Sequence, residues 1–391
     1  MRSLPSRPFT IKFWNGAEVP ATSPDGPTFV VRSPKAVAHA VATPGQLGLG
    51  RAYASGLLEV DDLDRVIEVL DGWDPPSLDR RSRVRLALAA VRASGLTLPP
   101  RPPRAELRPR GRRHSKTRDA RAVRHHYDVS NDFFRLFLDD SMTYSCAVFS
   151  RGATTLEEAQ EAKLDLVCTK LGLEPGQRVL DVGSGWGSFA IHAATRYGVR
   201  VLGVTLSEPQ AELARRRVED AGVADRVEIR VLDYRDLAGE RFDAIASIGM
   251  VEHVGEEKID LYAERLAALL SPGGRLLNHG IARVRHSDAP AGPFSERYVF
   301  PDGEPLHLSR VLLALERAGL VTEHVEGLAA DYAETLRHWA RRFDERVEDA
   351  TRLGGAERTR VWRLYLRAAR NGFEGGFTSI YQVKCVRPVP R

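Results

Sequence analysis

The chain contains 391 residues, which is too long for one ordinary hydrophobic core and predicts about two domains. Apolar residues make up 43% and charged residues 28% of it, as in globular proteins, and the net charge of +5 is compatible with nucleic acid, an anionic membrane surface or solubility alone. The cysteines are far apart and form no C-x-x-C pair, so we expect no metal site, no disulfide framework and a reducing cytoplasm.

The N-terminal part, residues 1–95, is predicted to form a small α+β domain. Alternating apolar residues in 9–14 and 28–32 indicate strands, and helical periodicity follows in 62–70 and 83–91. No catalytic cluster is evident there, and we expect this domain to dock on a membrane or on a second protomer, the latter giving a homodimer. The chain begins without the apolar core of a signal peptide and lacks the roughly 20-residue apolar run that spans a bilayer, so membrane contact is expected to be peripheral.

Composition changes sharply in residues 96–124, which are rich in proline and arginine. Only Glu106 and Asp119 oppose this basic run, and we interpret it as a mobile linker. A solvated tether and a segment attracted to anionic lipid headgroups, at about 1 kcal/mol per basic residue, are both compatible with it. Nucleic acid is not expected, because no aromatic residues are interleaved with the arginines and no recognition module accompanies them. The basic residues are Arg101, Arg104, Arg108, Arg110, Arg112, Arg113, Lys116, Arg118, Arg121 and Arg124.

From residue 125 to 391, strands and helices alternate, which predicts a catalytic domain with a doubly wound α/β sheet. An amphipathic helix is expected in 208–218, between two of the strands. The parallel strands are expected at 179–182, 199–204, 227–231, 242–248 and 274–278.

The most informative stretch is 179–187, in which an apolar strand runs into a glycine-dense turn and then into a helix that begins near Ser188. Gly183 and Gly185 can adopt positive φ and let the backbone approach a ligand, while Asp181 places an anionic acceptor at the C-terminal edge of the sheet. The spacing is G-x-G-x-G, with Ser188 where a dinucleotide fingerprint has its third glycine. The turn therefore favours S-adenosylmethionine over NAD as the ligand.

Two further strand ends carry groups that suit an adenosyl ligand. Thr205, Leu206 and Gln210 follow the second strand, where Thr205 and Gln210 can bond a ribose, although many nucleotide folds place an acidic residue there. After the next strand, Asp233 can accept from an adenine amine and Tyr234 can cover the ring. Each residue alone would suit an ordinary loop, but their placement at successive strand ends predicts a cofactor site.

A set of short motifs carries a family resemblance. They are His125-His-Tyr-Asp-Val-Ser-Asn-Asp-Phe-Phe134, Met142-Thr-Tyr-Ser-Cys-Ala147, 179–187, Val204-Thr-Leu-Ser207, Met250-Val-Glu-His-Val-Gly255, Arg297-Tyr-Val-Phe-Pro301 and Tyr332-Ala-Glu-Thr-Leu336. Over about residues 120 to 387 the chain resembles the cyclopropane fatty acid synthases. The resemblance implies a Rossmann-like, class I S-adenosylmethionine-dependent methyltransferase that alkylates the cis double bond of an unsaturated phospholipid acyl chain. It also implies a bicarbonate ion beside the reacting carbons as proton acceptor.

The resemblance also implies roles for individual residues. Cys146 matches the cysteine of the family's Y-S-C motif, Glu252 the glutamate of its E-H-V-G motif, and His279 its histidine. Tyr332 matches the tyrosine before the T-L pair, and Ser184 stands where the family commonly has cysteine, a near-isosteric change that we expect to be silent. The remaining positions are Gly249 and Ile281, as main-chain contacts to the ion, and Tyr144 and Ser145, which would touch the cofactor.

The chemistry supports the same set independently. An alkene is a weak nucleophile, so alkylating it requires a strong electrophile such as a methyl sulfonium, aligned in a water-free pocket. The resulting carbocation can be stabilised by aromatic faces and must lose a proton to an anion, which His279, Tyr332 and the Cys146 region can hold. Glu252 carries the ion's own sign, so we expect it to accept from the ion's hydroxyl and not to act as the base. The aromatic residues near the motifs are Tyr127, Phe133, Phe134, Phe137, Tyr298, Phe300, Tyr332 and Trp339.

The predicted function is that of a cytoplasmic enzyme, peripherally associated with the inner face of the membrane, that closes a cyclopropane ring on a phospholipid acyl chain. A hydride shift before proton loss would instead give a methylene group, the precursor of a methyl branch, and the sequence leaves both outcomes open. A methyltransferase for a soluble metabolite and a non-catalytic lipid-binding protein are further alternatives. Taken singly, Cys146, His253 and the aromatic residues of 131–137 also suit ordinary packing roles.

Overall fold

The protein is represented by a computed structural model, which describes residues 7–24, 26–72, 79–93, 100–107, 112–119, 121, 130–288 and 292–390. The chain divides into two compact units. Each unit is assembled from separate stretches of the chain, so the units cut across the predicted domain boundaries at residues 95 and 124, which stay predictions. Unit 1 comprises residues 1–108, 292–299 and 347–371, and unit 2 comprises residues 109–291, 300–346 and 372–391.

The described part of unit 1 contains a four-stranded sheet in the order β2-β1-β3-β4, with β1 parallel to β3 and the other pairs antiparallel. Ile11, Val31 and Leu58 form its small core together with alanines of the first two helices. The predicted strands and helices of this region correspond to β1, β3, α3 and α4. The elements are β1 (Thr10–Phe13), β2 (Glu18–Val19), β3 (Thr28–Val31), α1 (Pro34–Ala42), α2 (Gln46–Ala54), β4 (Leu58–Val60), α3 (Leu63–Gly72), α4 (Arg80–Ala93), α11 (Pro293–Tyr298), α14 (Val347–Gly354) and α15 (Ala356–Glu374), whose last residues belong to unit 2.

Unit 2 is built on a mixed sheet in the order β11-β12-β9-β8-β5-β6-β7, with β10 beside β9. The strands from β5 to β9 run parallel, whereas β12 is antiparallel to β9 and β11. The doubly wound α/β fold is therefore confirmed, with two added strands that the sequence pattern did not indicate: the antiparallel β12 beside β9, and β11 at the edge beyond it. The strands are β5 (Arg178–Val182), β6 (Arg200–Thr205), β7 (Val227–Val231), β8 (Phe242–Ile248), β9 (Leu270–Arg283), β10 (Leu306–His307), β11 (Val321–Gly327) and β12 (Thr378–Val386).

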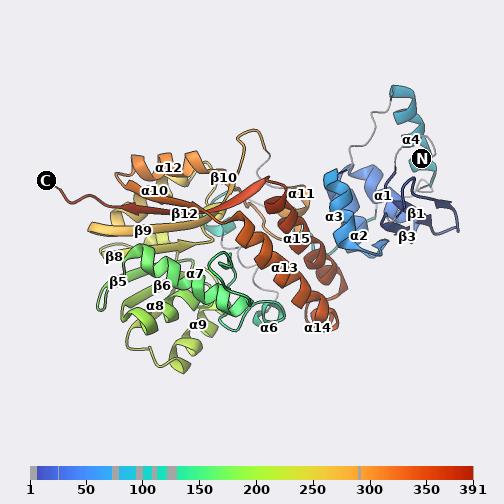
Figure 1. The fold of residues 1–391 in the computed structure, drawn as a ribbon. Helices are drawn as coiled ribbons and strands as arrows, with labels where there is room; N and C mark the ends of the chain where they lie inside the picture. The colour runs from blue at the N-terminus through green and yellow to red at the C-terminus, as the bar shows by residue number, and fades with distance from the viewer. Residues whose placement is uncertain are drawn as a thin grey trace. The chain divides into compact units, whose positions relative to one another are not determined.

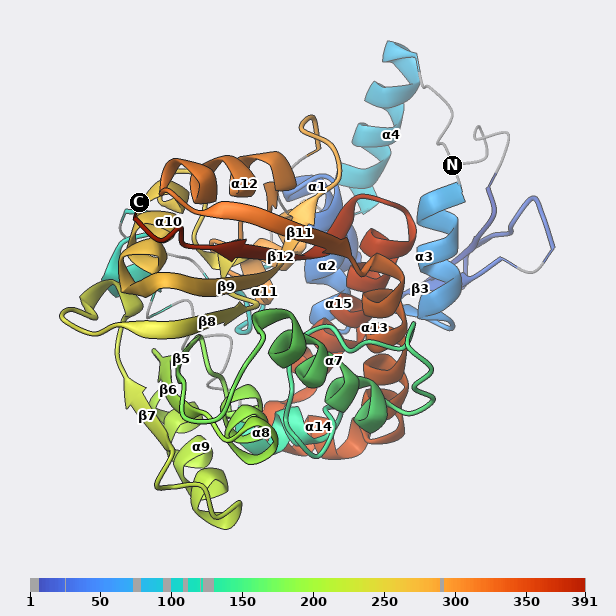
Figure 2. The ribbon, with the colours of Figure 1, turned by 60° about the vertical axis from the view of Figure 1, so that its left-hand side comes forward.

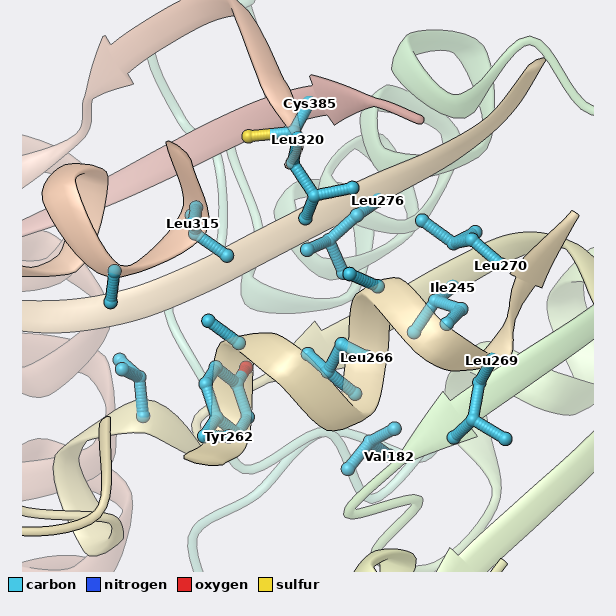
Figure 3. Packing of buried hydrophobic residues seen from close by; sticks show 14 of the residues in the cluster. Val182, Ile245, Tyr262, Leu266, Leu269, Leu270, Leu276, Leu315, Leu320 and Cys385 are labelled. Atoms are coloured by element: carbon cyan, nitrogen blue, oxygen red, sulfur yellow. The ribbon is translucent and has the colours of Figure 1, made fainter. Parts of the chain in front are cut away.

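Helices cover both faces of this sheet, as Figures 1 and 2 show: α7, α8 and α9 on one face, α10 and α12 on the other. Side chains of α10 and α12, including Leu266 and Leu315, pack on Val182, Ile245 and Leu276 of the strands (Figure 3). The helical elements of unit 2 are α6 (Asn131–Arg135), α7 (Leu156–Leu171), α8 (Ser188–Tyr197), α9 (Glu208–Asp220), η1 (Tyr234–Asp236), η2 (Val251–His253), α10 (Ile259–Leu269), α12 (Leu308–Arg317) and α13 (Ala329–Glu345).

The chain order reverses at β5, which lies between β6 and β8. Ligands of doubly wound folds bind at the carboxyl ends of the strands at such a reversal, because the helices on either side leave a crevice there. Asp181 lies in β5, in register with Gly203 of β6 and Ala246 of β8. The fold therefore places the glycine turn, which follows β5, where a ligand site is expected.

The described part of the predicted linker is tied down by ion pairs. Arg118 bonds the buried Asp302 of unit 2 at 2.5 Å, and Lys116 pairs with Asp236. In unit 1, Glu106 accepts both ends of the Arg51 guanidinium at 2.7 Å. Within the described residues, acidic side chains from distant parts of the sequence thus pair with several of these basic residues, which composition alone did not indicate. Arg108, Arg110 and Arg124 lie outside the described residues.

Candidate active site

One cavity of unit 2 lies at the carboxyl ends of β5, β6 and β8, beside the glycine turn. All of the predicted cofactor residues line it, although they come from loops far apart in the sequence. Their assignment as cofactor ligands remains a proposal, but the fold brings the whole set to one place. These residues are Tyr144, Ser145, Asp181, Gly183, Gly185, Thr205, Leu206, Gln210, Asp233 and Tyr234.

The glycine turn has the backbone that the sequence predicts. Gly183 and Gly185 have φ of +80° and +53°, a region that side-chain-bearing residues rarely adopt. The N–H groups of Gly183 and Ser184 both donate to the carbonyl of Val204 at 3.0 Å, which pins the turn to the end of β6. A Cβ at Gly183 would lie 2.8 Å from Met250 Cγ, so this glycine also permits a close approach of the next loop.

Asp181, the penultimate residue of β5, is a buried carboxyl group that lines the cavity. Its Oδ2 atom has no hydrogen-bond partner among the described residues. Burial raises the pKa of this carboxyl, and the nearby Lys163 ammonium opposes the rise. A buried acceptor of this kind is stabilised by a cationic or hydrogen-bond-donating ligand.

The polar groups after β6 and β7 are already engaged with each other. Thr205 Oγ1 donates to Gln210 Oε1 at 2.8 Å, so these side chains form one bonded pair. Asp233 accepts from the guanidinium of Arg235 at 2.6 Å, and Arg235 also bonds Asp119 at 3.0 Å. Neither Arg235 nor Asp119 was predicted to lie in the cavity wall; the arginine two residues after Asp233 was the available signal.

A second polar cluster lies where β8 and β9 end. Ile248 and His279 are in register, and the N–H of Gly249 donates to the His279 carbonyl at 2.8 Å. This bond occupies the N–H of Gly249, so only its carbonyl oxygen remains for another ligand. Glu252 follows on η2, and its Oε2 atom would lie 3.3 Å from a Cβ at Gly280, the β9 residue between His279 and Ile281. The fold thus brings together four of the predicted catalytic residues, of which Gly249 also lines the cavity.

Burial controls the protonation of this cluster. It raises the pKa of the Glu252 carboxyl to about 7, against the lowering effect of hydrogen bonds from the main chain of Glu252 and Ile281. It also holds the pKa of His279 well below its ordinary value, helped by the Lys163 and Lys170 ammonium groups, so the imidazole is neutral. Within the described part of the chain, neither ring nitrogen of His279 nor Glu252 Oε2 has a hydrogen-bond partner.

Main-chain bonds connect Cys146 and Tyr332 to the same strand ends. The Cys146 thiol donates to the carbonyls of Ala147 at 3.1 Å and Leu328 at 3.7 Å, and the Leu328 carbonyl also accepts from the N–H of Tyr332 at 3.1 Å. Leu328 N–H in turn donates to Ile380, which stands opposite Ile281 across the β9–β12 pair. Cys146 and Tyr332 therefore stand one strand away from the Glu252 cluster, although neither lines the cavity.

The thiol of Cys146 is built to stay protonated. Burial raises its pKa well above the ordinary value, and the Asp331 carboxylate adds to the rise. Burial also raises the pKa of Cys168 and of Cys385. Because the thiolate is the reactive species, iodoacetamide at neutral pH is expected to label the native protein at least about a hundredfold more slowly than the unfolded chain. Mass spectrometry of the peptides measures this; rapid labelling of native Cys146 would contradict it.

Helix α7 carries two buried polar residues that were not predicted to belong to the site. Gln160 Nε2 donates to the carbonyls of Thr143 at 3.2 Å and Ser145 at 2.9 Å. Lys163 Nζ donates to Ser145 Oγ at 2.9 Å and lines the cavity. A capping box formed by Thr155 and the third helical residue fixes where the helix begins. No local pattern singles out these two residues, because polar side chains on a helix ordinarily face water.

Some of the predicted aromatic residues lie in the hydrophobic core, and others lie beside the cavity. Phe133, Phe134 and Phe137 are fully buried, which fits the packing role that their helical spacing allowed. Phe134 packs edge-on against Tyr144 at 5.4 Å between ring centroids, and the Trp339 ring lies 5.2 Å from Tyr144. This cluster therefore forms an apolar wall behind the Tyr144–Cys146 loop.

The other predicted aromatic residues are dispersed. Tyr332 packs on Trp339, and Phe300 packs near His253, which lines the cavity. Tyr298 belongs to unit 1, where its hydroxyl donates to Glu106 at 3.2 Å. Tyr127 and the histidines of its motif lie outside the described residues.

The doubly wound sheet, the glycine turn after β5 and the cavity at the strand reversal define an S-adenosylmethionine-dependent methyltransferase. Residues 114–383 match the mycolic acid cyclopropane synthetase family, and the chain belongs to this family.

Named relatives agree with this assignment. The chain is 42% identical to a probable fatty acid methyltransferase of Mycobacterium tuberculosis over 372 residues, which is 92% of this chain and 87% of that protein. It is 35% identical to the cyclopropane-fatty-acyl-phospholipid synthase of Escherichia coli, over 88% of this chain and 84% of that protein. A crystal structure of a mycolic acid cyclopropane synthase complexed with SAH and CTAB superimposes with a TM-score of 0.65 and 33% identity, covering 68% of this chain and 98% of the other.

Proposed function

We propose that this enzyme transfers the methyl carbon of S-adenosylmethionine to the cis double bond of an unsaturated phospholipid acyl chain and closes a cyclopropane ring. The observation that carries the proposal is the cluster of enclosed, unsatisfied polar atoms of Glu252 and His279 beside the cofactor cavity. A methyltransferase acting on an oxygen or nitrogen nucleophile would not need a buried oxyanion-binding cluster behind the cofactor. The relatives act on fatty acyl or mycolic acyl chains by name, which supports the same substrate class.

The cluster fits a small oxyanion that carries one hydroxyl group. Neutral His279 can donate one ring N–H to such an anion, while the Glu252 carboxylate can accept from the hydroxyl. Both groups have atoms that lack a partner in the described structure, and a bound ion would satisfy them. Bicarbonate has the required charge, size and hydroxyl, and would supply the base that takes up the proton lost by the substrate.

The enzyme's own residues would orient the reactants and exclude water. The glycine turn and the groups after β6 and β7 would hold the adenosyl part, and the cavity extends to Gly249 at the edge of the polar cluster. Phe134, Phe137 and Trp339 make the wall behind the Tyr144 loop apolar, so a carbocation formed there would be shielded from solvent. The neutral thiol of Cys146 would act as a donor and not as a nucleophile.

A second product is compatible with the name of the probable fatty acid methyltransferase, which specifies methyl transfer and not ring closure. If a hydride shifts before proton loss, the same carbocation gives an exocyclic methylene. Expression in a bacterial host followed by mass spectrometry of its lipids decides between the products: an added CH2 that survives hydrogenation indicates cyclopropane, and one that takes up H2 indicates methylene. Absence of any added CH2 in lipids, with methylation of a soluble acceptor, would overturn the lipid assignment.

We also propose that helix α4 docks the enzyme on anionic phospholipid. Val84 and Leu88, four residues apart on α4, are 52% and 53% exposed. Exposed arginines accompany them, and α4 contains no acidic residue, so its charge complements an anionic lipid surface. No helix in the described ranges has the length and apolarity needed to cross a bilayer. The exposed arginines are Arg80, Arg81, Arg85 and Arg92.

Reversing two charges on α4 should release the enzyme from vesicles. At about 1 kcal/mol per basic residue near the surface, the double variant Arg81→Glu/Arg85→Glu is expected to bind anionic vesicles at least tenfold more weakly at low salt. Arg216→Glu/Arg265→Glu makes the same change in net charge at exposed positions of unit 2 and serves as control. Sedimentation with phosphatidylglycerol vesicles measures binding. Equal losses in the two variants would show that net charge alone matters and would refute the role of α4.

A further inference from the structure

Lys163 is a buried cation whose charge the described structure does not neutralise by contact. The residue is 1% exposed, and Nζ donates to Ser145 Oγ at 2.9 Å. An ammonium has three N–H donors, and no carboxylate of the described residues lies within 4.0 Å of this one. Burial lowers the pKa of Lys163 to about 8, so the ammonium form still predominates at neutral pH. A buried charge without a partner is costly, and an anion beside it would stabilise the protein.

The ammonium borders the cavity together with Asp181, a buried carboxyl group of β5. Asp181 Oδ2 likewise has no hydrogen-bond partner in the described part of the chain. The two side chains come from different elements, α7 and β5, and neither satisfies the other by a direct ion pair. A ligand with one carboxylate and one ammonium group would complement both.

The sheet indicates which end of the ligand lies here. Asp181, Thr205 and Asp233 lie at or just beyond the ends of β5, β6 and β7, three neighbouring strands, so Asp181 and Asp233 are separated by about 10 Å at roughly 4.8 Å per strand. Helix α7 packs near β8 and β9, on the side of β5 away from β7. The Glu252 cluster lies on that same side. A ligand with its adenine near Asp233 would therefore present its other end to Lys163.

We propose that Lys163, with Ser145, binds the carboxylate of the amino acid part of S-adenosylmethionine, while Asp181 takes the ammonium group. This inference rests on the proposed use of S-adenosylmethionine by this enzyme. Lys163 is a binding residue that fixes the amino acid end of the ligand, and through Ser145 it also fixes the loop that carries Tyr144 and Cys146.

The test compares two ligands that differ only in the carboxylate. Isothermal titration calorimetry measures binding of S-adenosylhomocysteine and of its decarboxylated analogue to the wild-type enzyme and to Lys163→Met. S-adenosylhomocysteine is expected to bind the variant about tenfold to a hundredfold more weakly, because a hydrogen-bonded charge pair is lost. The decarboxylated analogue is expected to bind the variant and the wild type within about threefold, since it cannot make that pair.

Several controls separate the possible failures. Lys170→Met removes a half-buried lysine of the same helix that is paired with Glu326 and does not line the cavity, and it should leave both affinities unchanged. Lys163→Gln is measured in parallel, so that a folding defect in one variant does not end the test; circular dichroism checks both. If wild-type enzyme binds neither ligand, the proposed function itself fails. If it binds S-adenosylhomocysteine and the Lys163 variants bind it equally well, or lose both ligands equally, the carboxylate assignment is overturned.

A small inorganic anion is the competing occupant. The titrations are therefore repeated with and without added bicarbonate. An affinity difference between wild type and Lys163→Met that persists without bicarbonate supports the carboxylate assignment. A difference that arises only when bicarbonate is present would assign Lys163 to the ion instead.

Discussion

Lipid modification is expected to fall at least about a hundredfold in Glu252→Ala and in His279→Ala, while S-adenosylmethionine binding is retained. Neither side chain lines the cofactor cavity, yet His279 is fully buried and Glu252 half-buried beside its edge, and both have enclosed polar atoms that no described residue satisfies. Their hydrogen bonds would therefore serve the group that accepts the proton and not the cofactor. Positioning of a proton acceptor typically contributes a factor of about 10² to 10⁴ in rate.

The rate of lipid modification should depend on pH through the ionisation of the Glu252 carboxyl group. Burial raises the pKa of its carboxyl to about 7, so the protonated form prevails below that pH and the carboxylate above it. Only the carboxylate can accept from the hydroxyl of a bound ion, and turnover is therefore expected to decline as the pH falls through about 7. Glu252→Gln should show a lower rate without this step.

Incorporation of labelled methyl groups into phospholipid vesicles measures the rate, and calorimetry measures cofactor binding in the same preparations. Glu264→Ala and His324→Ala remove the same side-chain types from exposed positions and should retain full activity. Unchanged turnover in both site variants would refute the assignment of the cluster. If cofactor binding is lost together with turnover, Glu252 and His279 would instead be assigned to cofactor binding.

The cofactor residues could be predicted because a parallel sheet aligns the carboxyl ends of its strands. Asp181, Thr205 and Asp233 each lie at or just beyond the end of a recognisable apolar strand, and a doubly wound fold must bring such positions to one edge. The glycine turn added a local constraint, which the positive φ of Gly183 and Gly185 satisfies. Local pattern and general topology were sufficient for this half of the site.

The Glu252 cluster could be proposed only through the family resemblance. Glu252 and His279 are separated by a helix, and only the register of β8 with β9 brings them together. Lys163 escaped notice for a related reason: a lysine on an amphipathic helix ordinarily faces water, and no spacing rule indicates that this one faces a cavity. The pairing of Arg235 with Asp119 joins segments 116 residues apart, which no local pattern encodes.

Local sequence patterns also failed to predict some features of the fold that depend on long-range pairing. Strands β11 and β12 were not predicted, since their alternation is weak and their place is set by antiparallel pairing of β12 with β9 and of β11 with β12. Unit 1 includes residues 292–299 and 347–371, although both stretches fall within the predicted catalytic domain, residues 125–391. Such long-range grouping depends on packing among side chains that are distant in the sequence.

Gly280→Ala is expected to destabilise unit 2 by about 3 kcal/mol and to inactivate the enzyme. Gly280 lies in β9 between His279 and Ile281, and a Cβ there would lie 2.1 Å from Val251 Cγ1 and 3.3 Å from Glu252 Oε2. The cost arises from lack of space and not from backbone strain, because the φ of Gly280 is not positive. The added methyl would push η2, and with it the Glu252 carboxylate, away from the strand.

Two further variants isolate this steric cause. Gly222 has φ of +67° with nothing within 4 Å of an added Cβ, so Gly222→Ala should cost only about 1 kcal/mol, from backbone strain alone. Val251→Ala in the Gly280→Ala background removes the clashing methyl groups and should restore part of both stability and activity, because residues in contact are not additive. Urea unfolding followed by hydrogen exchange in β8 and β9 peptides measures stability within unit 2. If the double variant is no more stable than Gly280→Ala, a clash with Val251 does not cause the loss of stability. Glu252 would then be the neighbour that leaves no room for a side chain at position 280.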